Sequence, residues 1–386
     1  MNYIQRKAEI YLQKDLSTTK VVIVLGARQV GKTTLVQHIL KENAVFLNLD
    51  IEVDKNRLMS ASSLAPKEAL KNFGNPKFLV IDEAQRLTDA GRIVKGWHDA
   101  QLPVKIILLG SSSLNLLNQT AESLTGRNVK IFLPPLIFEE ILGAQSWYSP
   151  EFTKSALYQN FSNQIQETLI QTIVFGSYPE AIASDDKKGY LLNLVSDYLL
   201  KDVLQIGLVK TPDLIKNLLM LLAHQVGSEV SVSELASNLK TTRVTVDRYL
   251  DLLEQTFVIF RLPAFSTNSR KEIAKNQKIY FWDTGVRNAL INEFSLNPLR
   301  GDIGALWENW VIAEFGKQNA LIGKRKNLYF WRARTGGEVD LVIKEGAKIN
   351  AYEIKWSKKS VSRQSFSLKY GAPVQLIDSS NPLIQI

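Results

Sequence analysis

The stretch Val21-Val-Ile-Val-Leu25-Gly26-Ala-Arg-Gln-Val-Gly31-Lys32-Thr33-Thr34-Leu35 decides the fold of the first part of this chain. Its uninterrupted apolar run is typical of a strand that is covered on both faces of a parallel sheet. The run enters a turn with two glycines, and a helical pattern follows over Thr33–Leu40. A strand, a glycine-rich turn and a helix in this order predict an α/β fold.

The turn matches the pattern G-x-x-x-x-G-K-[ST] at every fixed position. Its glycines allow backbone N–H groups to curl around phosphate oxygens at the amino end of the helix. Lys32 is expected to reach the β- and γ-phosphates, and the Thr33 hydroxyl to ligate Mg²⁺. The residues predicted to bind ATP are Gly26, Ala27, Arg28, Gln29, Val30, Gly31, Lys32, Thr33 and Thr34.

A second apolar strand, Phe78–Ile81, ends in two acids, Asp82 and Glu83. Ligands of parallel sheets bind at the carboxyl ends of the strands, so both acids are expected to face the phosphate loop. Asp82 is predicted to hold Mg²⁺ together with Thr33. Glu83 is predicted to be the base that polarises the attacking water.

Two further residues are candidates for the same reaction. Ser111 follows the predicted strand Ile106–Leu109 and can hydrogen-bond the γ-phosphate or the water, although a plain turn explains it as well. Arg127 lies on a short turn, and an arginine from the same or a neighbouring subunit would stabilise the charge of the transition state. The alternative for Arg127 is an ordinary surface arginine. Strands at Val45–Leu49 and Val129–Leu133 complete the predicted sheet.

Composition limits what the rest of the chain can be. With 386 residues, of which 45% are hydrophobic and 22% charged, it is expected to form several globular domains. It has no cysteine and three well-separated histidines, which excludes disulfides, thiolate metal sites and an HExxH site. No apolar run reaches the roughly 18 residues of a membrane span. Because the amino terminus is charged rather than signal-like, we expect a cytoplasmic protein.

The net charge of +9 lies in the last third of the chain. Residues 261–386 contain 20 Lys and Arg against 11 Asp and Glu, whereas residues 1–260 are balanced. A basic domain attached to a neutral one favours a polyanionic partner, most often nucleic acid. The alternative is a surface that only keeps the protein soluble.

Residues 231–255 have the pattern of two helices joined by a turn, with the second helix over Arg243–Gln255. Strands at Val258–Leu262 and Lys278–Trp282 can pair behind them, and the whole resembles a winged helix-turn-helix. The resemblance implies that Arg243 and Arg248 face DNA, with Thr242 and Thr245 beside them. Such helix pairs also pack against proteins, so an assembly role stays open.

The strands Glu338–Ile343 and Ala351–Trp356 are predicted to form a hairpin. Side chains two apart in a strand share a face, so Glu353 and Lys355 point the same way and the hairpin can bring Asp340 beside them. Such a group can hold a divalent cation and activate a water for attack on a phosphodiester. Glu308, on the predicted helix Gly304–Lys317, would add a third acid.

This pattern resembles the PD-(D/E)xK nuclease fold, particularly its Holliday-junction-resolvase branch, although Val339 stands where the family has proline. The resemblance implies that Asp340, Glu353 and Lys355 are catalytic, with Glu308, Asp340 and Glu353 as metal ligands. The alternative is a salt-bridged sheet face around Lys355.

The chain as a whole resembles the AAA-type branch of P-loop ATPases. More narrowly, it is similar to a prokaryotic ATPase family that joins this domain to a carboxyl-terminal domain of uncertain function. The motifs that carry the resemblance are Gly26–Leu35, Asn48-Leu-Asp50, Ile81–Gln85, Gly126-Arg127, Phe175–Glu180, Trp282–Gly285 and Glu338-Val-Asp340.

We predict four parts: an ATPase core over residues 1–145, a helical lid over 146–226, a winged helix over 227–290 and a basic nuclease-like α/β domain over 291–386. The predicted function is Mg²⁺-dependent ATP hydrolysis coupled to DNA binding and to DNA cleavage or remodelling. The alternative is an ATP-driven switch or assembly protein, in which an inert nuclease-like domain binds a protein partner. A protein-directed ATPase is a third hypothesis, and a homo-oligomer is compatible with Arg127 acting from a neighbouring subunit.

Overall fold

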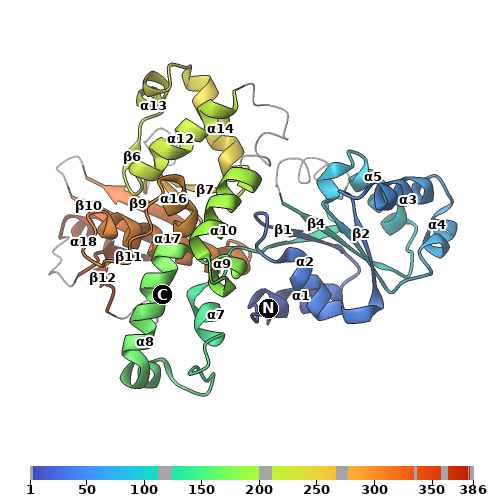
Figure 1. Ribbon diagram of the computed structural model, residues 1–386, viewed down its shortest axis with the longest axis horizontal. Helices are drawn as coiled ribbons and strands as arrows, with labels where there is room; N and C mark the ends of the chain where they lie inside the picture. Colours follow the sequence, from blue (N-terminus) through green and yellow to red (C-terminus); the bar gives the residue numbers. More distant parts are fainter. Residues whose placement is uncertain are drawn as a thin grey trace. The chain divides into compact units, whose positions relative to one another are not determined.

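The computed structural model describes residues 3–111, 124–199, 211–266, 277–333, 337–357, 364–380 and 382 (Figure 1). They form two compact units. The first holds residues 6–134 and 255–257, and the second holds the remaining described residues. The finer division predicted after residues 145, 226 and 290 stays a prediction.

The first unit is built on a parallel sheet with the strand order β2-β3-β4-β1-β5, which confirms the α/β fold class. The predicted strands are all present, and their ends differ from the expected ones by one residue at most. They are β1 (Val21–Leu25), β2 (Ala44–Asn48), β3 (Phe78–Asp82), β4 (Lys105–Gly110) and β5 (Asn128–Phe132).

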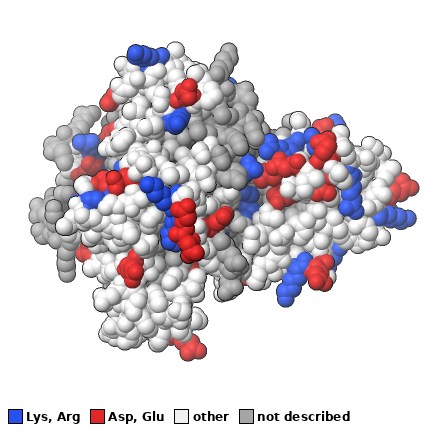
Figure 2. Space-filling view, viewed as in Figure 1, with Lys and Arg blue, Asp and Glu red and all other residues white. Residues whose placement is uncertain are grey.

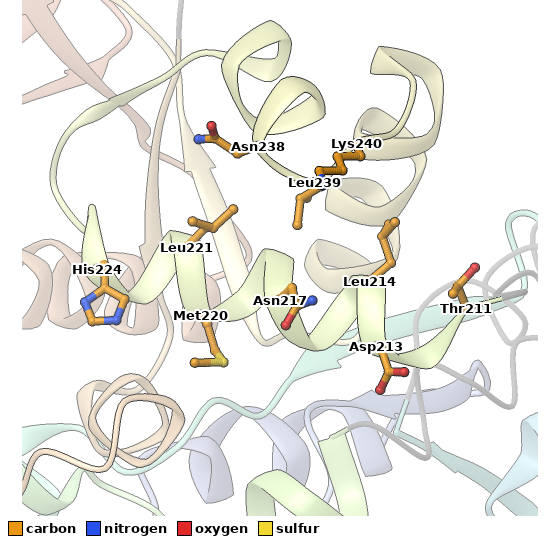
Figure 3. Close-up of a pocket in the computed structure, with 10 residues that line it drawn as sticks. All are labelled: Thr211, Asp213, Leu214, Asn217, Met220, Leu221, His224, Asn238, Leu239 and Lys240. Carbon is orange, nitrogen blue, oxygen red and sulfur yellow. The ribbon is translucent and has the colours of Figure 1, made fainter.

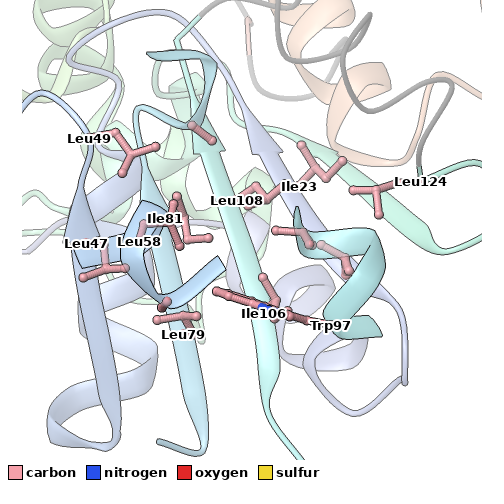
Figure 4. Close-up of a cluster of buried hydrophobic side chains, with 14 of the residues drawn as sticks. Ile23, Leu47, Leu49, Leu58, Leu79, Ile81, Trp97, Ile106, Leu108 and Leu124 are labelled. Atoms are coloured by element: carbon pink, nitrogen blue, oxygen red, sulfur yellow. The ribbon is translucent and has the colours of Figure 1, made fainter. Parts of the chain in front are cut away.

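Helices of the first unit connect these strands, except for the first helix, which precedes β1. They are α1 (Ala8–Leu16), α2 (Lys32–Leu40), η1 (Lys41–Asn43), α3 (Glu52–Ser62), α4 (Pro66–Asn72), η2 (Ala84–Arg86) and α5 (Ala90–Asp99). Because alternate strand residues face opposite sides of a sheet, Ile23, Leu79 and Leu108 lie in one core with Leu58 of α3 and Trp97 of α5 (Figure 4). Every residue of β1 is buried, as expected of a strand covered on both faces.

The second unit begins with helices: α7 (Phe138–Gly143), α8 (Lys154–Phe175), α9 (Pro179–Ala183), α10 (Lys187–Asn193), the π-helix η3 (Leu194–Leu199) and α12 (Pro212–His224). A small antiparallel sheet with the order β6-β8-β7 follows, built from β6 (Glu229–Val230), β7 (Ile259–Leu262) and β8 (Gln277–Phe281). The helices α13 (Val232–Asn238) and α14 (Arg243–Gln255) lie between β6 and β7 in the chain. The predicted pairing of the strands near residues 258–262 and 278–282 is therefore confirmed.

A second, mixed sheet with the order β12-β11-β10-β9 closes the second unit. Its strands are β9 (Asn327–Arg332), β10 (Glu338–Glu345), β11 (Lys348–Ile354) and β12 (Val374–Ile377), accompanied by α16 (Thr284–Leu290), α17 (Ile303–Leu321) and α18 (Gln364–Tyr370). The predicted hairpin is present, with Leu341 opposite Tyr352. Among the described helices, none has the length and apolar character needed to span a membrane.

Candidate nucleotide site and carboxylate cluster

The phosphate loop lies between β1 and α2 and depends on its glycines. Gly31, with a φ of 91°, precedes α2 in the left-handed region, which glycine adopts without steric cost. A Cβ on Gly26 would lie 2.2 Å from the carbonyl oxygen of Leu133. The buried Lys32 Nζ donates to the carbonyl oxygens of Gly26 and Ala27, at 3.0 and 2.9 Å. These contacts keep the ammonium inside the loop that is predicted to receive phosphate.

Arg6 supports this loop and was not predicted from the sequence. Its guanidinium is buried and donates to the carbonyl oxygens of Val30, at 2.9 Å, and Pro134, at 2.6 Å. The two hydrogen bonds tie the loop to the chain that follows β5. No sequence pattern distinguishes Arg6, because its partners lie 24 and 128 residues away.

The acids at the end of β3 lie beside α2, as expected. The Thr33 hydroxyl donates to Asp82 Oδ2 at 2.6 Å, and the Glu83 N–H donates to Asp82 Oδ1 at 2.8 Å. Glu83 has a φ of 51°, which turns the chain sharply after the strand. Burial raises the pKa of Glu83, while the nearby Lys32 ammonium opposes this change.

Gln85 connects Glu83 to Ser111. Its Nε2 donates to Glu83 Oε2 at 2.5 Å and to Ser111 Oγ at 3.1 Å, and the Ser111 hydroxyl lies 3.4 Å from the same Glu83 oxygen. The structure thus brings Ser111 to the predicted base. Its neighbours Ser112 and Ser113, which compete with it in the sequence, lie outside the described residues.

Asp50 lies near two arginines at this edge of the sheet. Its carboxylate is 2.6 Å from Arg86 Nε and 4.0 Å from a terminal nitrogen of Arg28 in the phosphate loop. The loop residue Arg28 thus lies near an acid that follows β2, at a distance longer than a hydrogen bond.

Arg127 is not brought to the phosphate loop of its own chain. Its carbonyl oxygen accepts from the N–H of Val21, the first residue of β1, while the loop follows the last one. At about 3.3 Å per residue, the two ends of this strand are about 13 Å apart. The Arg127 side chain pairs with Asp99, at 2.6 Å. This placement excludes the same-subunit role, and a role towards a neighbouring subunit stays a prediction.

The predicted carboxyl-terminal residues do come together on the β10–β11 hairpin. Lys355 Nζ lies 2.9 Å from Glu353 Oε1 and 3.3 Å from Asp340 Oδ2. The Ile354 N–H donates to the same Asp340 oxygen at 2.7 Å. Burial, and then the charge of Glu308, raise the pKa of Asp340 to about 7.

Lys278 of β8 joins this cluster, and sequence analysis missed it. Its Nζ lies 3.0 Å from Glu308 Oε1 and 2.6 Å from Glu338 Oε1. The Tyr280 hydroxyl donates to the same Glu308 oxygen at 2.6 Å. Burial alone would lower the pKa of Lys278, but the surrounding carboxylates outweigh it and raise this pKa.

The carboxylates do not form the predicted metal site. Among the residues that the structure describes, no group of three or more Asp, Glu or His side chains is arranged to hold a metal ion. Glu308 is bound to Lys278, and Asp340 and Glu353 are bound to Lys355. In the described part of the structure Glu308, Asp340 and Glu353 thus do not gather as metal ligands, and their role in metal binding stays a prediction.

The predicted DNA-facing helix, α14, carries both signs of charge. Arg243 and Arg248 are exposed, and so are Asp247 and Asp251 on the same helix. Arg261 of β7 forms an ion pair with Asp251. The exposed face of α14 is thus close to neutral, unlike a surface that binds phosphate by charge alone.

A separate hollow lies along α12, facing the end of α13 (Figure 3). Leu214, Leu221 and Leu239 form its apolar part, and Asp213, Asn217 and Lys240 contribute polar groups. It contains none of the residues singled out from the sequence.

Residues 18–142 match the AAA domain family, residues 166–297 match a domain of unknown function (DUF8612), and residues 303–376 match a domain of unknown function (DUF4143). Uncharacterized proteins of Mycobacterium tuberculosis and Methanocaldococcus jannaschii are 28% and 27% identical. The mycobacterial match covers 93% of this chain and 76% of that protein, and the archaeal match covers 88% and 76%.

Among solved structures, the chain is similar to a Walker-type ATPase of Pyrococcus abyssi, with a TM-score of 0.52 and 15% identity. The match covers 75% of this chain and 96% of that one, and at this identity it concerns the fold. Together with the AAA domain match, it supports the presence of a P-loop ATPase domain of the AAA type in the first unit.

Proposed function

We propose that this protein hydrolyses ATP to ADP and phosphate at the phosphate loop. The observation that carries the proposal is the 2.6 Å hydrogen bond from Thr33 to Asp82, directly beside Lys32. It joins a hydroxyl and a carboxylate, which are the oxygen ligands that Mg²⁺ prefers in nucleotide sites. The residues present therefore fit the ion that phosphoryl transfer requires.

Each residue has a distinct part in this proposal. The loop amides and Lys32 bind the phosphates, and Thr33 and Asp82 would hold Mg²⁺, which neutralises charge on the β- and γ-phosphates. Glu83 takes a proton from the attacking water, and its raised pKa makes it a better proton acceptor than an ordinary glutamate. Gln85 and Ser111 orient the Glu83 carboxylate.

Phosphate release from ATP tests this proposal. Lys32→Ala and Glu83→Gln should both lose turnover, and Glu83→Gln should retain nucleotide binding because the loop is unchanged. Lys130→Ala is the matched control, since Lys130 is an exposed lysine of the same sheet. Turnover that persists in Lys32→Ala would overturn the proposal.

We also propose that a polyanion, with DNA as the first candidate, binds at one edge of the mixed sheet in the second unit. Lys324 and Arg325 precede β9, and Lys344 and Lys348 flank the β10–β11 turn; all four are exposed. Since Lys344 lies opposite Asn327 in the β9–β10 pair, these residues gather at the same edge. On the face shown in Figure 2, by contrast, described residues of both signs are interspersed.

This basic edge lies away from Asp340, which is four residues from Lys344 and thus about 13 Å along β10. The basic edge and the carboxylate cluster are therefore separate features of the sheet, and contact at the edge does not by itself require cleavage at the cluster. An ATP-driven switch with an inert nuclease-like domain stays the alternative to DNA cleavage.

Fluorescence anisotropy with labelled DNA at two salt concentrations tests the contact. A Lys324→Glu, Arg325→Glu double variant should weaken binding and reduce its salt dependence. Arg243→Glu, Arg248→Glu tests the helix that the sequence favoured. If neither double variant changes binding, or if the protein does not bind DNA, the contact is refuted and a protein partner becomes the better hypothesis.

A further inference from the structure

The cluster around Lys278 carries an inference that does not depend on ATP hydrolysis. The acids that the sequence assigns to a metal ion are instead shared among two lysines and a tyrosine. We infer that Lys278 is the resident cation of this cluster, and that its ammonium excludes divalent metal ions from Glu308 and Glu338.

The contacts of Lys278 have the properties of a built-in ion site. Its side chain is 4% exposed, and its Nζ lies within 3.0 Å of two carboxylates from different elements, α17 and β10. The Phe330 ring, with its centroid 5.6 Å from the ammonium, adds a cation–π contact. A lysine so deeply buried and so fully surrounded keeps its positive charge, because its partners replace the water it has lost.

Glu308 shows why the amine competes directly with a metal. A single Glu308 oxygen, Oε1, accepts from both Lys278 and Tyr280. The backbone also approaches it closely, since a Cβ on Gly227 would lie 3.3 Å from this oxygen. A divalent ion that binds Glu308 through this oxygen would therefore have to displace the lysine.

The same contacts join two parts of the second unit. Lys278 belongs to β8 of the small antiparallel sheet, whereas Glu338 belongs to the mixed sheet. Removing the amine leaves two partly buried carboxylates without their counter-charge, which is unfavourable. A variant without this amine should therefore either recruit another cation or lose stability.

Binding of MnCl₂, followed by electron paramagnetic resonance without nucleotide, tests the inference. An Asp82→Asn parent removes the carboxylate of the phosphate site, so that a signal abolished by Glu308→Gln reports the cluster. The parent should not bind Mn²⁺ at the cluster, whereas the added Lys278→Ser change should create Mn²⁺ binding there. Lys278→Arg keeps the charge and should remain without bound Mn²⁺.

Specific outcomes would overturn the inference. One is Mn²⁺ binding by the parent that Glu308→Gln removes, because the native lysine would then not exclude the metal. Another is a folded Lys278→Ser variant that gains no binding. If Lys278→Ser does not fold, the parent alone decides. The inference is supported if the parent shows no Mn²⁺ binding that Glu308→Gln would remove. It is refuted if the parent does show such binding. Loss of ATP turnover in the same preparations bears only on the phosphate site.

Discussion

The Arg6 guanidinium donates a 2.9 Å hydrogen bond to the carbonyl oxygen of Val30, a residue of the phosphate loop. Arg6 precedes α1 and lies 24 residues before Val30 in the sequence, yet its side chain supports the phosphate loop. It is a positioning residue, because its contacts are to backbone carbonyls.

Replacing Arg6 should therefore affect binding more than chemistry. Lysine lacks the planar guanidinium whose two nitrogens contact Val30 and Pro134, and a buried carbonyl left unpaired costs about 1–3 kcal/mol. We expect Arg6→Lys to raise the KM for ATP by about tenfold with a smaller change in kcat. Steady-state turnover measures both, and Arg92→Lys, at an exposed arginine of α5, is the control. A fall in kcat at constant KM would contradict the positioning role.

Gln85 should set the pH dependence of turnover. Glu83 acts as a base only when ionised, so activity is lost as the pH falls through its pKa. The hydrogen bond from Gln85 lowers this pKa, against the larger effect of burial, which raises it. Gln85→Ala should consequently move the acid limb of the kcat profile to higher pH. The exposed Gln37→Ala leaves the limb in place, and an unchanged limb in Gln85→Ala would argue against the contact.

Gly26 should not tolerate a methyl group. A Cβ there would meet the Leu133 carbonyl oxygen at 2.2 Å, a backbone atom that cannot move aside alone. Gly26→Ala should cost about 1–3 kcal/mol or more in the free energy of unfolding and weaken nucleotide binding. Gly96→Ala, inside α5 with no atom within 4 Å of the added Cβ, should instead be neutral or stabilise by up to about 1 kcal/mol. Urea unfolding compares the two, and equal effects would refute this account.

Asp340 should make the stability of the second unit fall with rising pH. Its pKa is about 7 in the folded protein because of burial and the Glu308 charge, well above its ordinary value of 3.8. Folding therefore favours the protonated acid, and this contribution is full below pH 4 and is lost as the pH rises through about 7. Asp340→Asn, which mimics the protonated acid and still accepts from Ile354, should show a smaller loss of unfolding free energy between pH 5 and pH 8. The exposed Asp89→Asn should behave like the native protein, and an equal loss in Asp340→Asn would contradict the assignment.

Local patterns in the sequence determined the elements of both sheets that carry the candidate sites. The run Val21–Leu25 and the two glycines after it specify a strand, a turn and a helix by backbone preference and apolar periodicity alone. The hairpin that joins Asp340 to Glu353 and Lys355 is equally local, because its turn is short and side chains two apart share a strand face. Such features depend on neighbours within a few residues, so they can be predicted from the sequence without knowledge of the tertiary structure.

Only the tertiary structure decided which charges meet. Lys278 reaches Glu308 and Glu338 across 30 and 60 residues, and no pattern in the sequence joins these three residues. Arg127 lies at the end of β1 opposite the phosphate loop, because β5 pairs with β1 in parallel. No motif around Arg127 indicates this position. Charge pairing depends on distance in space. For two residues far apart in the sequence, this distance is set by the order of the strands in the folded sheet.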